Sequence, residues 1–141
     1  MKPKQIVPGL ILGGIDDLDV MLTMQPDVLA PLDRLPGRIW RTGFRGEILY
    51  FPIPDREVLP DDVLEALVSA ILARIRGGKR VALFCHGGHG RTGYMAACAL
   101  FLLGVTEPMP FLWRNYSASA VETDVQMLAV ERFCRRHVPR D

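Results

Sequence analysis

Residues 81–103 read VALFCHGGHGRTGYMAACALFLL, which is two apolar runs joined by a glycine-rich segment. The first run, Val81–Phe84, is continuously apolar, as is typical of a parallel strand that is buried on both faces. The second run, Arg91–Leu103, is long enough for a buried helix and is closed by Gly104. The sequence therefore predicts a tight loop, Cys85–Gly93, between a core strand and a helix.

This loop carries a thiol and a guanidinium, Cys85 and Arg91, separated by five residues of which three are glycine. Glycine lets the backbone curl tightly and turn its N–H groups inward. Converging amides and a helix N-terminus form a site for an anion, and the planar fork of arginine matches two oxygens of a phosphate. The same field stabilises a thiolate, so Cys85 is predicted to be nucleophilic at neutral pH.

The segments around the loop alternate between strand and helix patterns, which indicates an α/β fold: a single domain over residues 1–141 with a central, mostly parallel sheet flanked by helices. The predicted strands are Ile6–Gly13, with a turn or bulge at Pro8-Gly9, then Val28–Leu32 and Ile48–Ile53. The predicted helices are Asp16–Met24, Leu59–Arg76, Pro108–Tyr116 and a last one from about Ser119, where Glu122 completes a capping box. Leu35–Gly46 is predicted to be mostly loop.

The composition excludes several classes of function. The 141 residues include 17 Lys+Arg and 16 Asp+Glu, a net charge of +1, so no polybasic nucleic-acid arm or acidic tail is present. No apolar run approaches the roughly 18 residues of a membrane helix. The cysteines, Cys85, Cys98 and Cys134, form no CxxC pair, which argues against a disulfide framework or a four-cysteine zinc site. We expect a cytoplasmic protein without nucleic-acid or membrane partners.

Cys85–Gly93 resembles the signature of the cysteine-dependent protein tyrosine phosphatase superfamily, a P-loop of the CX5R type, although Phe84 stands where that signature usually has histidine. The likeness is closest to the small dual-specificity phosphatases, particularly the cyclin-dependent-kinase-associated and related prokaryotic types. Two further motifs occur in the order of that family. Phe51–Asp55 resembles its general-acid loop, and Ala120–Thr123 followed by Gln126 resembles its final-helix motif.

The resemblance implies metal-independent hydrolysis of phosphate monoesters through a cysteinyl-phosphate. Cys85 would attack the phosphorus, Arg91 would hold the equatorial oxygens, and Asp55 would protonate the leaving oxygen and then activate water. Thr92 lies where the family's hydroxyl assists departure of the thiolate, and Gln126 would position the water. The residues expected to bind phosphate are His86, Gly87, Gly88, His89, Gly90 and Arg91.

Other carboxylates lie near Asp55 in the sequence. Asp61 and Asp62 are better explained as residues at the start of a helix, and Glu57 is a weaker candidate for the acid. Gln126 has an equally good interpretation as an ordinary polar helix residue.

The histidines of the loop also have two interpretations. His86 and His89 could bind a metal together with Cys85, but structural roles are favoured. His86 would then brace the loop by hydrogen bonding through its ring, and His89 would point outward. Cys98 is predicted to be a core residue, and a redox partner of Cys85 is the alternative.

The predicted substrate is a phosphorylated protein or peptide, phosphotyrosine first and phosphoserine or phosphothreonine second, bound by a monomer that needs no cofactor. Phosphate-like anions should occupy the same site. The alternatives are a rhodanese-like sulfurtransferase, a module that binds phosphoresidues without turnover, and a zinc protein. Within the phosphatases, a phosphoinositide or a small phosphate ester is the alternative substrate.

Overall fold

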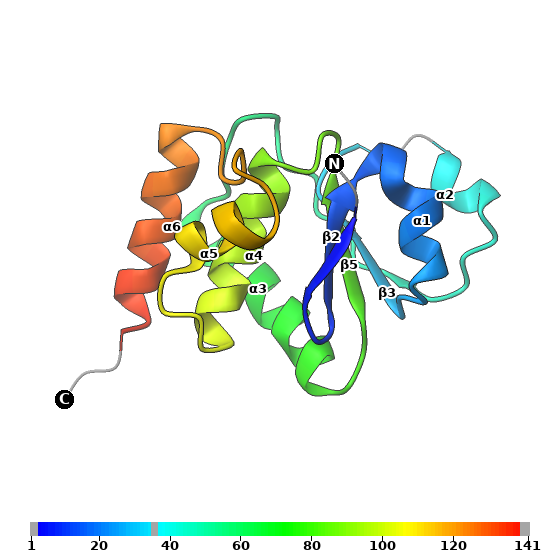
Figure 1. Ribbon diagram of the computed structural model, residues 1–141, viewed down its shortest axis with the longest axis horizontal. Helices are drawn as coiled ribbons and strands as arrows, with labels where there is room; N and C mark the ends of the chain where they lie inside the picture. Colours follow the sequence, from blue (N-terminus) through cyan, green and yellow to red (C-terminus); the bar gives the residue numbers. More distant parts are fainter. Residues whose placement is uncertain (1–2, 35–36, 139–141) are drawn as a thin grey trace.

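A five-stranded sheet forms the centre of the computed structural model, which describes residues 3–34 and 37–138 (Figure 1). The strands lie in the order β1-β2-β5-β3-β4. They are β1 (Lys4–Val7), β2 (Leu10–Gly14), β3 (Val28–Pro31), β4 (Glu47–Ile48) and β5 (Val81–Cys85). Only β1 and β2 pair antiparallel, so the predicted mostly parallel sheet is confirmed.

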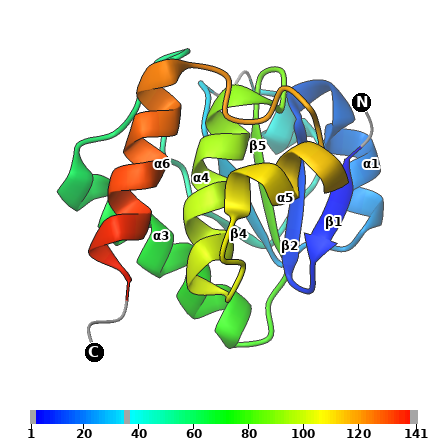
Figure 2. The same ribbon diagram turned by 60° about the vertical axis from the view of Figure 1, so that its left-hand side comes forward.

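Helices cover both faces of the sheet (Figures 1 and 2). One face carries the 3₁₀ turn Ile15–Asp17, α1 (Leu18–Thr23) and α2 (Arg38–Arg41); the other carries α3 (Asp61–Arg76), α4 (Gly90–Leu102), α5 (Pro108–Asn115) and α6 (Asp124–Arg136). The side chains of β5 alternate between two apolar clusters, with Leu83 packed toward α3 and α4 and Phe84 toward α1. Because both faces of β5 are covered, its sequence is apolar throughout.

The predicted strand Ile6–Gly13 is a hairpin rather than one strand. β1 and β2 are joined at Pro8-Gly9, where Gly9 has a φ of +88°, so the predicted turn is confirmed. The predicted strand Ile48–Ile53 is shorter, since β4 ends at Ile48.

The segment that follows β4 still lies along β3. The N–H groups of Leu49 and Phe51 donate to Leu29 O and Pro31 O at 2.8 and 3.2 Å. Ile53 N–H, beyond Pro52, donates to Leu32 O at 2.9 Å, whereas Pro52 and Pro54 have no N–H to contribute.

The predicted loop Leu35–Gly46 contains a short helix, α2, that the sequence analysis did not predict. Its residue Ile39 is buried against α1 and β3, and this one apolar contact explains why the segment folds back onto the sheet. Leu35 and Pro36 lie outside the described residues.

The carboxyl ends of β2, β5 and β3 meet at one edge of the sheet, where ligands bind in parallel α/β folds. The residues that directly follow β2 and β3 hold the end of β5 and the start of the next loop. Ile15 N–H donates to His86 O at 3.1 Å, and Leu32 N–H donates to Phe84 O at 2.7 Å. No helix formed by residues 3–34 and 37–138 is long and apolar enough to cross a membrane.

Candidate active site

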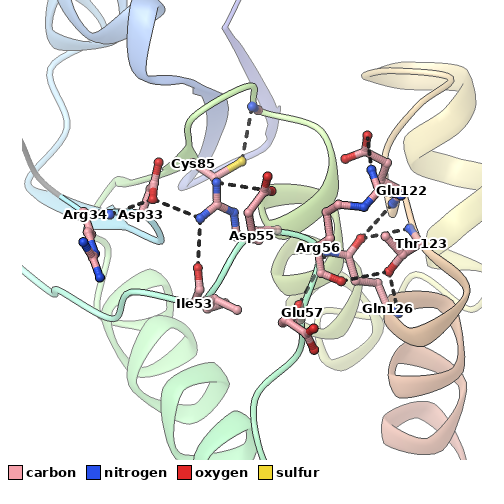
Figure 3. A network of polar contacts seen from close by, with 12 residues as sticks. Asp33, Arg34, Ile53, Asp55, Arg56, Glu57, Cys85, Glu122, Thr123 and Gln126 are labelled. Carbon is pink, nitrogen blue, oxygen red and sulfur yellow. Dashed lines mark hydrogen bonds and ion pairs between the residues drawn. The ribbon is translucent and has the colours of Figure 1, made fainter.

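Cys85 is the last residue of β5, and its side chain is buried. The segment Cys85–Arg91 is here called the anion loop. Gly88 N–H donates to Cys85 Sγ at 3.2 Å (Figure 3). Gly88 has a φ of +82°, which only glycine adopts without strain, and this conformation directs its N–H to the sulfur. Helix α4 begins at Gly90, so the positive end of its dipole adjoins the loop. One loop N–H and a helix N-terminus therefore adjoin the Cys85 thiol.

The N-terminal end of α6 packs directly against this loop. A Cβ at Gly90 would lie 3.0 Å from Glu122 Oε2 and 3.1 Å from Gln126 Oε1. A larger residue at position 90 would therefore crowd these two side chains and force them to shift.

Arg91 is almost completely buried, and its guanidinium is fixed by three contacts (Figure 3). Nη1 donates to Ile53 O at 2.8 Å and to Asp33 Oδ1 at 3.0 Å, while Nη2 lies 3.6 Å from Asp55 Oδ1. Within residues 3–34 and 37–138, no hydrogen bond engages Nε. The edge formed by Nε and Nη2 can therefore bind two oxygens of a phosphate.

Asp33 was not singled out by the sequence analysis. It follows β3 by two residues and brings a carboxylate to the edge of the site. Burial raises the pKa of Asp33, but hydrogen bonds from Arg34 N–H and Arg91 outweigh this effect and hold the pKa below its usual value. Asp33 is therefore ionised at neutral pH and orients Arg91. Its position just after the carboxyl end of a core strand is the sequence feature that could have marked Asp33 as a site residue.

Asp55 lies on a turn, here called the acid loop (Pro54–Glu57). Its carboxylate is exposed and lies 3.6 Å from Arg91 Nη2. Glu57 N–H donates to Pro54 O at 3.0 Å, and Arg56 has a φ of +65°. Such a backbone conformation is costly for a residue other than glycine, so the loop needs support from its surroundings.

That support comes from the N-terminal end of α6. Thr123 Oγ1 donates to Arg56 O at 3.3 Å, Gln126 Nε2 donates to Glu57 O at 3.5 Å, and the Arg56 guanidinium lies 3.6 Å from the Glu122 carboxylate. These contacts link the acid loop to the same helix end that packs on the anion loop.

The predicted start of the last helix at Ser119 is wrong. α6 begins at Asp124, and its capping box consists of Thr123 and Gln126 instead of Ser119 and Glu122. Gln126 is fully buried; its Oε1 accepts from Glu122 N–H and Thr123 N–H at 2.9 and 3.1 Å. Gln126 is therefore a buried capping residue that fixes the start of α6.

Replacing Gln126 with alanine should lower the free energy of unfolding by about 2 kcal/mol, because two backbone N–H groups lose their acceptor. Urea denaturation measures this change. Glu131→Ala, at an exposed position of the same helix, is the control and should alter stability far less. Equal stability of the two variants would contradict the structural role of the Gln126 amide.

A cavity of about 350 Å³ opens above the anion loop. Its lining includes three carboxylates, Asp33, Asp55 and Glu122, together with Cys85, His86, Gly87, His89, Gly90 and Arg91. In the sequence, Glu122 belongs to a capping pattern and to the final-helix motif, and neither places it over the loop, because the bend that brings it there depends on tertiary contacts.

Thr92 and His86 both contact the end of β2 or the residue that follows it. Thr92 is buried, and its hydroxyl donates to Gly13 O at 3.4 Å. The His86 ring is exposed; the contact that braces the loop at this residue is the bond from Ile15 N–H to the His86 carbonyl, so the expected bracing by the ring is not what the structure shows.

His89 does not point outward as expected. It is partly buried, and its Nδ1 lies 2.8 Å from Ser117 Oγ. In the described part of the chain, no group of three or more His, Cys, Asp or Glu residues is arranged to hold a metal ion. Cys98 lies in the core as predicted, where burial raises the pKa of its thiol well above the usual value.

A cysteine and an arginine that share one glycine-rich loop, between the central parallel strand and a helix, define the class of cysteine-dependent phosphatases. The chain belongs to the family described as Swiss Army Knife protein, DSP-PTPase phosphatase domain, which matches residues 37–136. It is therefore a phosphatase domain of the dual-specificity type, and the predicted resemblance and fold class are confirmed.

Solved structures share this fold, and a curated relative of uncharacterized function is similar in sequence. Tk-PTP in its active form is 26% identical, with a TM-score of 0.81 over 95% of this chain and 97% of that one. Kinase associated phosphatase shares the fold at 15% identity, with a TM-score of 0.68 over 94% and 86% of the two chains. The uncharacterized protein MJECL20 of Methanocaldococcus jannaschii is 32% identical over 90 residues, 64% of this chain. The chain spans only 61% of that protein's length.

Proposed function

We propose that this domain hydrolyses phosphate monoesters on proteins, phosphotyrosine first and phosphoserine or phosphothreonine second, without a metal. The observation that carries the proposal is the convergence of Cys85, Arg91 and Asp55 on one cavity. A nucleophile, a phosphate-binding fork and a proton donor are the groups that this reaction needs. We further propose that it acts as a monomer in the cytoplasm.

In the first step the Cys85 thiolate attacks the phosphorus while the bond from phosphorus to the leaving oxygen breaks. Asp55 supplies the proton that the leaving oxygen takes up. The loop N–H groups and the Nε–Nη2 edge of Arg91 hold the three equatorial oxygens, on which transition-state charge gathers. The product of this step is a cysteinyl-phosphate and a free hydroxyl compound.

In the second step Asp55, now a carboxylate, takes a proton from water as the water attacks the phosphorus. The sulfur–phosphorus bond breaks and the thiolate is restored. Thr92 is proposed to stabilise the departing thiolate, since its hydroxyl makes a long contact, 3.4 Å, to Gly13 O. Gln126 is buried and does not line the cavity, so its proposed role in positioning the water would be exerted through the acid loop, where its Nε2 donates to Glu57 O.

The charges around the cavity favour a substrate with a single phosphate. Its lining contains three carboxylates and one cation, Arg91, which already faces Asp33 and Asp55. A second phosphate on the same substrate would meet carboxylates rather than lysines, so multiply phosphorylated inositides fit poorly.

Hydrolysis of an aryl phosphate with and without EDTA tests the proposal directly. Full activity in EDTA is the expected result. Activity that requires added metal would overturn the metal-free mechanism. Transfer of sulfur from thiosulfate to cyanide without phosphate release would instead identify a rhodanese-like enzyme.

Replacing Asp55 with asparagine should lower kcat for phosphotyrosine peptides by about 10² to 10³-fold, because no proton reaches the poor leaving group. The loss should be smaller for p-nitrophenyl phosphate, whose leaving group departs without protonation. Steady-state kinetics on both substrates measure the difference, with the KM values close to wild type.

The matched control for this variant is Glu57→Gln. Glu57 lies on the same acid loop and is exposed, but it does not line the cavity. It should keep the wild-type rate on both substrates. If Glu57→Gln slows the reaction and Asp55→Asn does not, the acid has been assigned to the wrong residue.

A further inference from the structure

Tyr116 and Ser117 have no part in the motifs described above, yet both contact the anion loop. Tyr116 O–H donates to Gly88 O at 2.7 Å, and Ser117 Oγ lies 2.8 Å from His89 Nδ1. Two consecutive residues that follow α5 therefore hold two consecutive residues of the loop.

The backbone that carries these side chains is itself fixed. The N–H groups of Tyr116 and Ser117 both donate to Leu112 O at 2.9 Å, which closes the end of α5. Ser119 N–H donates to Ser117 Oγ at 3.1 Å. Because several bonds hold this segment, it can act as a support for the anion loop rather than move with it.

The bond from Tyr116 determines how one peptide unit of the loop is oriented. The Gly88 carbonyl and the His89 N–H belong to the same trans peptide, so they point in opposite directions. Holding the carbonyl on the side of Tyr116 therefore turns the His89 N–H to the other side. Gly88 N–H, at the preceding peptide, already donates to Cys85 Sγ.

A tether is needed at this point because Gly87 and Gly88 are both glycine and allow rotation of the backbone. If the Gly88–His89 peptide turned over, a carbonyl oxygen would face the phosphate and repel it. Burial, with smaller contributions from Cys85 and Asp17, raises the pKa of Tyr116 well above its usual value. The hydroxyl therefore stays protonated and remains a donor.

We infer that Tyr116 is a positioning residue of the phosphatase reaction, which holds the Gly88–His89 peptide with its N–H, not its carbonyl, toward the bound phosphate. Ser117 supports the same arrangement through the His89 ring. The inference rests on the proposed function, because it assigns the loop N–H groups to phosphate.

The test is Tyr116→Phe, which removes the donor and keeps the ring. Affinity for inorganic phosphate and vanadate should fall about tenfold, and kcat/KM on an aryl phosphate about 10- to 100-fold. Alkylation of Cys85 by iodoacetamide should require a higher pH, because the thiolate loses oriented N–H groups. The pH dependence of Cys85 alkylation is the measurement that a merely structural role of Tyr116 would not change.

Tyr94→Phe is the matched control. The Tyr94 hydroxyl is also buried and accepts a hydrogen bond from Leu59 N–H at 3.2 Å, away from the anion loop. Its loss should lower stability without changing vanadate affinity or the pH profile of alkylation. The other charged groups around the cavity are identical in both variants, so a difference between them comes from the hydroxyl that was removed.

Unchanged anion affinity and an unchanged alkylation profile in Tyr116→Phe would overturn the inference. If that variant does not fold, Ser117→Ala provides the test with the same expected direction. Phosphate binding and alkylation do not depend on turnover. A wild-type protein that hydrolyses no phosphate ester, but binds phosphate more tightly than Tyr116→Phe does, would therefore refute the proposed function and leave the positioning role standing.

Discussion

Replacing Cys85 with serine should reduce phosphate ester hydrolysis by about 10⁴-fold or more, because a serine hydroxyl is not ionised at neutral pH and is a far weaker nucleophile than a thiolate. The change is nearly isosteric, and the Gly88 N–H that donates to the sulfur keeps an acceptor. The fold and the phosphate site should therefore survive, so the variant should still bind vanadate.

Cys134→Ser makes the same chemical change on α6, outside the cavity, and should keep the wild-type rate. Rapid acid quenching during turnover should trap a phosphorylated peptide that contains Cys85 in the wild type and none in Cys85→Ser. Substantial activity in Cys85→Ser would show that phosphorus is attacked by another group.

The sequence was sufficient to predict the centre of the molecule. The apolar run before Cys85 and the glycine-rich segment after it are local features, and their geometry follows from backbone chemistry alone. β5, the anion loop and α4 occur within a residue or two of where the pattern placed them. The order of the motifs then led to Asp55, which the short segment Phe51–Asp55 could not have identified by itself.

The start of α6 was predicted wrongly because two capping-box patterns follow one another directly in the sequence. Ser119 with Glu122 and Thr123 with Gln126 both fit the pattern of a hydroxyl residue followed three positions later by Glu or Gln. Tertiary contacts decide between them. Val121 has a φ of +59°, which excludes a helix at that point, and its N–H donates to His89 O at 3.3 Å. Contact with the anion loop therefore delays the helix.

The residues that the sequence analysis missed share one property: each reaches the site from a distant segment. Asp33 contacts a residue 58 positions away and Tyr116 one 28 positions away. No spacing rule marks such residues. Their roles depend on how α5 and the end of β3 are packed around the loop, which only the three-dimensional structure shows.

Replacing Arg91 with lysine should lower kcat/KM by about 10³-fold. A lysine ammonium is a point charge on a flexible chain, so it cannot hold Ile53 O, Asp33 and two phosphate oxygens at the same time. The loss should appear in KM and in kcat, because the fork binds both the ground state and the transition state. Arg135→Lys, at an exposed position of α6, is the control and should have no effect.

The same substitution should make the stability difference between wild type and variant depend on pH. Arg91 helps to hold the pKa of Asp33 below its usual value in the folded protein, so the pair stabilises the fold above the pKa of the unfolded carboxyl. That contribution is lost as the pH falls through the lower, folded value. Urea denaturation should therefore show the full difference in free energy of unfolding between wild type and variant at about pH 7, and a smaller difference below about pH 4. A difference in free energy of unfolding that grows on acidification would mean that Asp33 and Arg91 do not stabilise each other.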